Sequence, residues 1–248
     1  MAPSPPKTVW ITGASSGIGR QLAVSFARDG AKVAISARSA VKLQELAASS
    51  PNIHSYPADV ADGTAIAETA ATIWRDLGGI ELVILNAGVW HPMGAENYDL
   101  PGAMQSMDVN YGGVINCLQP VMRAMLSRGS GHIAIVSSVA GYRGLPKSAA
   151  YGPTKAALNN LAESLYPELR AKGVRLTLIS PGFVATPMTD VNKFPMPFLV
   201  STEDAAAYIR RGLARDTFEI VFPWRMALMM KTLRLLPQRL FFWLTRPR

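Results

Sequence analysis

Short apolar runs alternate with longer segments of helical periodicity along most of the chain. Runs such as 33–35 and 82–85 are apolar at every position rather than at alternate positions, which is typical of parallel strands covered on both faces. We expect strands at 8–12, 32–37, 53–56, 81–85, 132–137, 175–180 and 219–222, and helices near 17–29, 39–49, 62–77, 99–127, 150–172 and 202–214. Such repeated alternation predicts an α/β fold with a doubly wound parallel sheet of about seven strands and helices on both faces.

Two segments stand apart from this alternation. Residues 187–200 have no clear periodicity and contain three prolines, so we expect a loop or lid there. Residues 224–248 follow the last predicted strand and mix cations with Trp, Phe, Leu and Met. Because no low-complexity linker interrupts the rest, the sequence predicts one domain at 1–223 and a basic apolar C-terminal tail at 224–248.

The composition excludes several classes of protein. Of the 248 residues 49% are hydrophobic and only 17% are charged, which excludes a disordered chain. The lone Cys117 excludes an intrachain disulfide scaffold and favours a reducing, cytoplasmic location. The three histidines and one cysteine have no metal-ligand spacing, so we expect no metal site. The Pro-rich N-terminus leads directly into a predicted strand, and we expect no signal peptide.

The net charge of +8 is concentrated at the C-terminus. Residues 1–219 carry 19 Lys+Arg and 17 Asp+Glu, whereas residues 220–248 carry six cations and no acid. A nucleic-acid binder would more typically spread a basic face over its fold, so no nucleic-acid partner is expected. Charges and Pro237 interrupt the tail, which therefore cannot supply the roughly 20 apolar residues of a membrane span. It resembles a segment that lies on a membrane surface, and the alternatives are packing on the body or on a partner subunit.

The glycine-rich run TGASSGIG at residues 12–19 follows a predicted strand and opens a predicted helix. Glycines there permit a tight turn whose backbone N–H groups approach a pyrophosphate at the helix N-terminus. One alternative is an ordinary turn. Another is the nucleophile elbow G-x-S-x-G of a hydrolase with Ser15 as nucleophile. That elbow needs a partner histidine, which usually comes late in such folds, yet the last histidine is His132.

Ala37 and Arg38 end the second predicted strand, where dinucleotide sites place the group that reads the adenosine ribose. An acid there binds the 2′-hydroxyl of NAD(H) and repels a 2′-phosphate. Arg38 instead offers donors to that phosphate, so we expect NADP(H) to be favoured over NAD(H). The alternative is an ordinary surface arginine.

Tyr151 and Lys155 are four residues apart at the start of a predicted helix and therefore share one face. A free tyrosine has a pKa of about 10 and needs help to act as an acid or base near neutrality. A cation at about 4 Å with an effective dielectric of about 20 contributes roughly 4 kcal/mol, on the order of three pKa units. Lys155 and an oxidised nicotinamide are thus expected to bring Tyr151 into working range, the alternative being an exposed helical pair.

These motifs occur together with NAG at 86–88, Asn110, SS at 137–138, PG at 181–182 and Thr186, in one order and spacing. In that combination, residues 7–222 resemble the short-chain dehydrogenase/reductase family, which implies a single-domain Rossmann fold and a homodimer or homotetramer. The resemblance implies that Tyr151 donates a proton to a carbonyl oxygen, Ser138 holds that oxygen, Lys155 binds the nicotinamide ribose and Asn110 holds a relaying water. The implied cofactor contacts are Gly13, Ser15, Ser16, Gly17, Ile18, Gly19, Arg38, Asp59, Val60, Asn86, Ala87, Gly88, Tyr151, Lys155, Pro181, Gly182 and Thr186.

Two residues depart from the family pattern. Ser16 stands where members that prefer NADP often carry a second basic residue, so the cofactor preference rests on Arg38. Pro167 falls inside the helix that starts at Tyr151 and is expected to kink or shorten it. Because the family usually dimerises through this helix and the one before it, we expect the interface to be affected.

The expected function is reversible interconversion of a carbonyl compound and an alcohol with NADP(H). Pocket candidates at the strand ends are mostly apolar or aromatic, which suits a hydrophobic or lipid-like substrate. The alternative for each of them is packing within its loop. They are Trp90, His91, Tyr142, Phe183, Met188 and Phe194. The alternative from another class is an NADP(H)-binding sensor or scaffold without turnover.

Overall fold

The computed structural model describes residues 4–192 and 194–246. Its strands are β1 (Thr8–Thr12), β2 (Lys32–Ser36), β3 (Ile53–Ser55), β4 (Leu82–Leu85), β5 (Gly131–Val136), β6 (Val174–Pro181) and β7 (Glu219–Phe222). Its α-helices are α1 (Gly17–Arg28), α2 (Ala40–Ala47), α3 (Gly63–Leu77), α4 (Leu100–Met107), α5 (Gly113–Arg128), α6 (Tyr151–Ala171), α7 (Thr202–Leu213), α8 (Trp224–Leu235) and α9 (Gln238–Thr245). A π-helical turn covers Asp108–Gly112, and a 3-10 turn covers Val139–Gly141.

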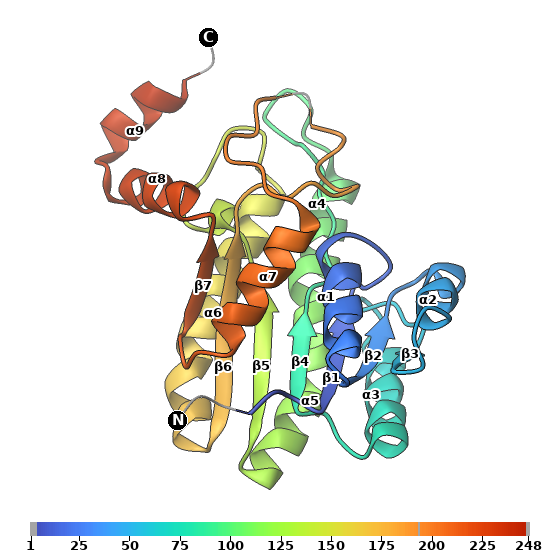
Figure 1. Cartoon of the computed structure of the whole chain (residues 1–248). Coiled ribbons are helices and arrows are strands. Elements are labelled where there is room, and N and C mark those ends of the chain that lie inside the picture. Colours follow the sequence, from blue (N-terminus) through green and yellow to red (C-terminus); the bar gives the residue numbers. More distant parts are fainter. Residues whose placement is uncertain (1–3, 193, 247–248) are drawn as a thin grey trace.

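The strands form one parallel sheet in the order β3-β2-β1-β4-β5-β6-β7 (Figure 1). The chain runs outward from β1 to β2 and β3, then returns to β4 on the other side of β1. Sheets wound in this way bind ligands at the carboxyl ends of the strands, where the strand order reverses. The predicted α/β fold with a doubly wound parallel sheet is confirmed, and the arrangement is that of a Rossmann fold.

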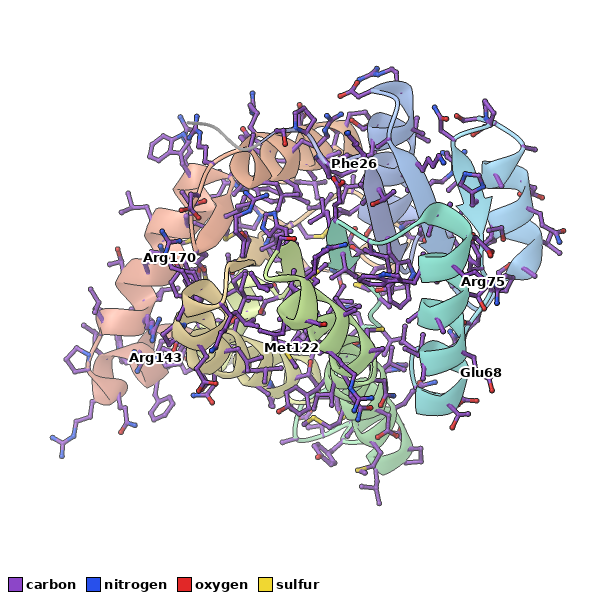
Figure 2. The ribbon with its side chains drawn as sticks, turned by 90° about the horizontal axis from the view of Figure 1, so that it is seen from below. Phe26, Glu68, Arg75, Met122, Arg143 and Arg170 are labelled. Carbon is purple, nitrogen blue, oxygen red and sulfur yellow. The ribbon has the colours of Figure 1, made fainter. Side chains whose placement is uncertain are left out.

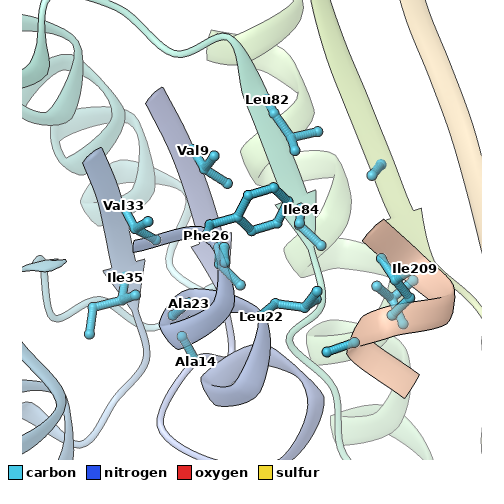
Figure 3. Packing of buried hydrophobic residues seen from close by; sticks show 14 of the residues in the cluster. Val9, Ala14, Leu22, Ala23, Phe26, Val33, Ile35, Leu82, Ile84 and Ile209 are labelled. Atoms are coloured by element: carbon cyan, nitrogen blue, oxygen red, sulfur yellow. The ribbon is translucent and has the colours of Figure 1, made fainter. Parts of the chain in front are cut away.

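Alternate strand residues point into two separate cores. Val9 of β1 faces the core closed by α1, α2 and α7, whereas Trp10 faces the core closed by α3, α5 and α6. In the first core, Phe26 of α1 lies close to Val9 and Leu82 (Figure 3). Figure 2 shows the two helical layers, with Phe26 labelled in one and Met122 of α5 in the other. Burial on both faces explains why the strands are apolar at every position.

Two of the predicted helices differ in the structure, and α8 and α9 lie beyond the last predicted helix. The sequence predicts a single helix near 99–127, but the structure has α4, the π turn and α5 in succession. Asn110 lies within this wider turn, and such turns are frequent at functional sites. Shortening of the helix at Pro167 is not seen, because α6 continues through Pro167 to Ala171.

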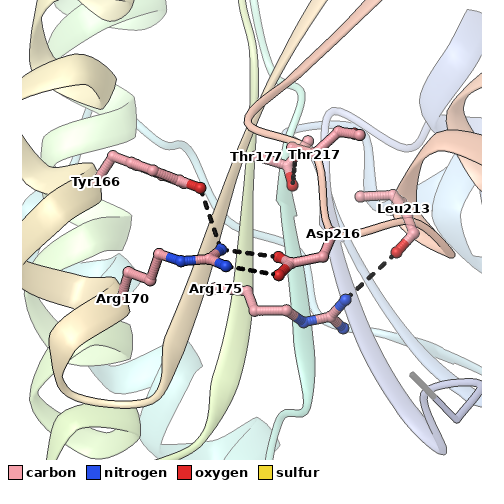
Figure 4. A network of polar contacts seen from close by, with 7 residues as sticks. All are labelled: Tyr166, Arg170, Arg175, Thr177, Leu213, Asp216 and Thr217. Atoms are coloured by element: carbon pink, nitrogen blue, oxygen red, sulfur yellow. Dashed lines mark hydrogen bonds and ion pairs between the residues drawn. The ribbon is translucent and has the colours of Figure 1, made fainter. Parts of the chain in front are cut away.

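A polar network ties α6 to the connection between α7 and β7, at the amino-terminal edge of the sheet (Figure 4). Arg170 of α6 donates two hydrogen bonds, of 3.0 and 2.9 Å, to the carboxylate of Asp216. Arg175 donates to the carbonyl of Leu213 at 3.4 Å. Because the Arg170–Asp216 pair is about half exposed, we expect it to stabilise the fold only slightly.

Residues after β7 fold as two helices separated by Pro237, and α8 packs on the body of the protein (Figures 1 and 2). Arg143 holds the end of α8, donating to the carbonyls of Leu233, Arg234 and Leu236 at 2.8, 3.0 and 2.7 Å. Its guanidinium also lies 4.1 Å from the ring centre of Phe241 in α9. Among the described residues, no helix has both the length and the apolar character to cross a membrane.

Candidate active site

A cavity of about 700 Å³ opens at the carboxyl ends of the strands, a size typical of ligand sites. It is lined by the turns after β1, β2, β4, β5 and β6, the start of α6, the loop after β6 and one face of α8. The lining includes most of the expected site residues: Gly13, Ser15, Ser16, Gly17, Ile18, Arg38, Asp59, Val60, Asn86, Ala87, Gly88, Ser138, Tyr151, Lys155, Pro181, Gly182 and Thr186. Side chains from distant parts of the sequence thus meet at one edge of the sheet.

The glycine turn between β1 and α1 brings backbone close to backbone. Gly13 has φ +67°, and a Cβ there would lie 2.7 Å from the Cα of Ala87. A Cβ on Gly17, where φ is +55°, would lie 3.1 Å from Cγ2 of Thr186. Gly19 lies behind the cavity wall and lets α1 approach the carbonyl of Gly13. This cradle of backbone groups at a helix N-terminus fits a pyrophosphate, which a side chain would exclude.

Asn86 joins the ends of β1 and β4 beneath the cavity. Its amide Nδ2 donates to the carbonyls of Thr12 and Gly13 at 3.0 and 3.2 Å. In return, Oγ1 of Thr12 accepts hydrogen bonds from the backbone N–H groups of Asn86 and Ala87 at 3.0 and 3.2 Å. These four bonds fix the width of the crevice at the glycine turn.

Two cations line the cavity beyond the end of β2. Arg38 is exposed there, and Lys42 follows it in the first turn of α2. Ser39 caps that helix by accepting from the N–H of Lys42 at 3.4 Å. Asp59, which follows the neighbouring strand β3 and also lines the cavity, accepts from the N–H of Ala61 at 3.0 Å and so closes a turn. A guanidinium and an ammonium beside a helix N-terminus suit an anionic group such as a phosphate.

Tyr151 and Lys155 lie one turn apart at the start of α6, and both line the cavity. The Nζ atom of Lys155 is 5.4 Å from the ring centre of Tyr151 and donates to the carbonyl of Val136 at 2.9 Å. The ring of Trp90 packs edge-on against Tyr151, with centroids 5.1 Å apart. Tyrosine, lysine and the hydroxyl of Ser138 therefore converge on one wall.

The segment that carries Ser138 is pressed against α6. Ser137 Oγ donates to the carbonyl of Lys155 at 3.1 Å and to Oδ1 of Asn159 at 2.6 Å. A Cβ on Gly141 would lie 2.7 Å from the carbonyl carbon of Lys155, so only glycine permits this approach. Ser138 itself begins the 3-10 turn and accepts from the N–H of Ala140 at 3.1 Å. These contacts fix Ser138 relative to α6.

Burial shifts the pKa values of both Tyr151 and Lys155. Burial raises the pKa of Tyr151 to about 12, although a hydrogen bond with Ser138 lowers it slightly. Burial also lowers the pKa of Lys155 from 10.5 to about 8. In the cofactor-free chain, desolvation outweighs the charge of Lys155, so the lysine alone does not bring the pKa of Tyr151 towards neutrality. That Lys155 and an oxidised nicotinamide together lower the pKa of Tyr151 stays a prediction. At neutral pH the phenol is protonated, and most of the lysine is charged.

Asn110 lies outside the lining, immediately behind it, and is fully buried in the π turn. Its Oδ1 accepts from the N–H of Val89 at 2.7 Å, and its Nδ2 donates to the carbonyl of Val89 and to Oγ1 of Thr154 at 3.0 and 3.2 Å. The side chain thus fixes the segment after β4 next to α6.

The family model of the short chain dehydrogenases matches residues 7–194. The chain belongs to the short-chain dehydrogenases. It is 38% identical over 245 residues to an uncharacterized oxidoreductase of Myxococcus xanthus, and the match covers 97% of each chain.

Solved structures agree with this assignment. A short chain dehydrogenase from Burkholderia cenocepacia in complex with NADP has a TM-score of 0.84 and 26% identity, covering 97% of this chain and 98% of that one. The structure described as ElxO with NADP bound has a TM-score of 0.78 and 27% identity, covering 87% and 97%. This short-chain dehydrogenase therefore belongs to a family of oxidoreductases and has the fold of that family.

The substrate side of the cavity differs partly from the prediction. Trp90, Phe183, Met188 and Phe194 line it, as expected. His91 and Tyr142 do not belong to the described lining. His91 pairs with Oε1 of Gln105 at 2.9 Å, and Tyr142 bonds to Glu219 beneath α8. Both polar tips thus have partners away from the cavity.

Sequence reasoning missed two groups of lining residues in this short-chain dehydrogenase. One is Ser39 and Lys42, whose signal is their place at the start of the helix after Arg38. The other is on α8, where Met226, Met229, Met230 and Leu233 line the cavity. Spacing of three and four residues among them is the signal of one helical face. In the part of the chain that the structure describes, no three His, Cys, Asp or Glu side chains gather as a metal site requires.

Proposed function

We propose that this short-chain dehydrogenase reduces a ketone or aldehyde to an alcohol with NADPH, and catalyses the reverse reaction with NADP⁺. The observation that carries the proposal is the convergence of Tyr151, Ser138 and Lys155 on the cavity that also contains the glycine turn. Fixed hydroxyl donors beside a nucleotide cradle are the arrangement that hydride transfer to a carbonyl needs.

The bound nicotinamide would supply the hydride to the carbonyl carbon. Negative charge then develops on the carbonyl oxygen, where the hydroxyls of Ser138 and Tyr151 stabilise it. Tyr151 donates its proton to that oxygen, which yields the alcohol. A pKa of about 12 keeps Tyr151 in the protonated form that reduction requires, and the nearby Lys155 ammonium stabilises the phenolate left behind. Asn110 would act behind this wall, where we propose that it helps to return a proton.

The two cations at the end of β2 support a preference for NADP(H) over NAD(H). Arg38 and Lys42 line the same part of the cavity, and a 2′-phosphate there would meet both. The neighbouring structures with bound NADP are in keeping with this choice. Members of the family that prefer NADP often carry a second basic residue at the position of Ser16. In this chain Lys42 would supply that second positive charge instead.

The substrate side favours a hydrophobic carbonyl compound. Aromatic and methionine side chains from three segments line the cavity there, among them Trp90, Phe183 and Met230. Methionines adapt to irregular apolar shapes, which suits a flexible chain.

We also propose a homodimer or homotetramer. Ile115 and Leu126 are exposed on α5, where a second copy would cover them. Light scattering after gel filtration tests this, and a monomer at micromolar concentration would contradict it.

The function is tested by NADPH oxidation with a panel of ketones and aldehydes. Tyr151→Phe removes the proton donor, and we expect kcat to fall at least about 100-fold while NADPH still binds. Tyr166→Phe on the same helix is the matched control and should retain activity. Wild-type protein that binds NADPH but turns over no carbonyl or alcohol would refute the enzyme and favour the sensor or scaffold.

A further inference from the structure

The two C-terminal helices expose more large apolar side chains than a surface normally leaves in water. On α8, Trp224, Leu228 and Leu235 are 67%, 61% and 84% exposed. They fall on one stripe, because 224, 228 and 235 follow the helical repeat. On α9, Phe242 and Trp243 are also exposed, with Leu240 and Leu244 beside them. A concentration of this kind marks a binding surface rather than scattered apolar residues.

The opposite face of α8 belongs to the cavity. Met226 and Met230 are buried, and with Met229 and Leu233 they line the substrate side. The helix is therefore apolar on two faces, which is typical of a helix covered on both sides. One helix, with a diameter of about 10 Å, is all that separates the cavity from the exposed stripe.

Charge identifies what covers the exposed face. Residues 220–248 carry six cations and no acid, and Arg225, Arg239 and Arg246 are exposed along the two helices. Arg225 and Lys231 flank the apolar stripe of α8 on either side, and Lys231 stays about half exposed although it also forms a salt bridge of 3.2 Å with Glu219. Cations beside Trp, Phe and Leu are the composition of helices that lie in the headgroup region of anionic lipid.

We propose that α8 and α9 lie in the plane of an anionic membrane surface and that the substrate is a long-chain aldehyde or ketone taken from that membrane. The second part rests on the proposed function. Hydride from the cofactor and a proton from Tyr151 reduce the lipid carbonyl to an alcohol, and NADPH becomes NADP⁺. Because only α8 lies between the acyl layer and the cavity, the substrate has to pass one helix to reach the cavity.

A second copy of the chain fits this surface less well. In a two-fold interface the same patch meets itself, so the exposed Arg225, Arg239 and Arg246 of each tail would come close to those of the other copy. A membrane with anionic lipid supplies opposite charge and an apolar layer together. The described helices are too short or too polar to span, so the contact is with one leaflet.

Vesicle flotation of the full chain tests the membrane contact directly. Wild-type protein is expected to float with vesicles of phosphatidylcholine containing about 30% phosphatidylglycerol, and much less with phosphatidylcholine alone or in high salt. The double substitution F242E/W243E should abolish flotation, and each exposed arginine replaced by Gln should weaken partitioning about fivefold. Val41→Glu, on the exposed face of α2, is the matched control and should float like wild type.

Activity separates the two parts of the proposal. Hexadecanal in anionic vesicles and butanal in buffer are compared with NADPH as cofactor. We expect F242E/W243E to raise KM for vesicle-borne hexadecanal at least about tenfold and to leave butanal turnover unchanged, since neither residue lines the cavity.

Three results would overturn the inference. One is wild-type protein that reduces butanal but does not float. Another is that wild-type protein does not bind vesicles while F242E/W243E forms a smaller oligomer than wild type. That result would assign the exposed face to a second copy of the chain. The third is equal KM values for hexadecanal in both proteins. Flotation without turnover of any carbonyl would instead refute the proposed function and with it the lipid substrate.

Discussion

Replacement of Lys155 by methionine should stabilise the protein while it abolishes turnover. The ammonium of Lys155 is buried, at 3% exposure, and its pKa falls from 10.5 to about 8 because of that burial. A difference of about 2.5 in pKa corresponds to about 3 kcal/mol at pH 7 by which the fold disfavours the charged form. Methionine has a similar length and no charge, so it removes this cost.

One loss opposes the gain. Lys155 donates to the carbonyl of Val136 at 2.9 Å, and methionine leaves that carbonyl without this donor, which costs about 1 kcal/mol. The expected net effect at pH 7 is about 2 kcal/mol more stability. For a chain of this length that corresponds to a Tm higher by about 4–8 °C.

The pH dependence identifies the cause. Between pH 8 and 10.5 the folded lysine is neutral while the unfolded lysine is still charged, so the unfolded state binds more protons. Wild-type stability must therefore rise with pH across this window relative to Lys155→Met, and the advantage of the variant must shrink. The comparison is best made at pH 7 and 9.5, below the pH at which Tyr151 titrates in the unfolded chain.

Urea unfolding of the cofactor-free proteins, followed by circular dichroism, measures the difference. Lys32→Met, at an exposed position at the start of β2, is the control and should change stability by less than about 0.5 kcal/mol. A variant less stable than wild type at pH 7, or a difference that does not change between pH 7 and 9.5, would refute the argument. Either result would mean that the ammonium of Lys155 is less desolvated than its burial indicates.

Three other substitutions probe the fold and the nucleotide site. Gly13→Ala places a methyl group 2.7 Å from the Cα of Ala87 at a positive φ, so it should lower the free energy of unfolding by at least about 2 kcal/mol in thermal unfolding. It should also abolish NADPH binding in calorimetry, and unchanged binding would contradict the assigned cradle. Arg38→Ser should weaken NADPH binding about 10- to 100-fold and leave NADH binding unchanged, and an equal loss for both would exclude a role at the 2′-phosphate. Phe26→Ala should cost about 3–5 kcal/mol in urea unfolding because Phe26 fills the core between α1 and the sheet, whereas a loss below 1 kcal/mol would contradict that packing.

The fold could be predicted because its signals are local. Strands such as β4 are apolar at every position, and the glycine turn after β1 and Tyr151 at the start of α6 mark where strands end and helices begin. In a parallel sheet these ends meet at one edge, so residues as far apart as Gly13 and Thr186 could be assigned to one site before any contact was known. Their common cavity follows from topology.

Other features depend on packing that a linear pattern does not contain. The π turn at Asn110 exists where its side chain bonds to Val89 and Thr154, which only the assembled fold places nearby. The protonation of Tyr151 depends in the same way on its surroundings. Helix spacing puts Lys155 beside the phenol, but the depth of burial, which decides the pKa, is set by other segments.

The C-terminal tail shows this limit most clearly. The sequence alone does not tell which of its methionines, leucines and aromatic residues are buried and which are exposed. The composition is therefore compatible with either a membrane surface or packing on protein. The structure separates these residues, because Arg143 and the salt bridge between Lys231 and Glu219 fix the rotation of α8. Met226 and Met230 then face the cavity while Leu235 faces outward. Packing and surface contact are thus two faces of one helix, and a change on either face can be tested without disturbing the other.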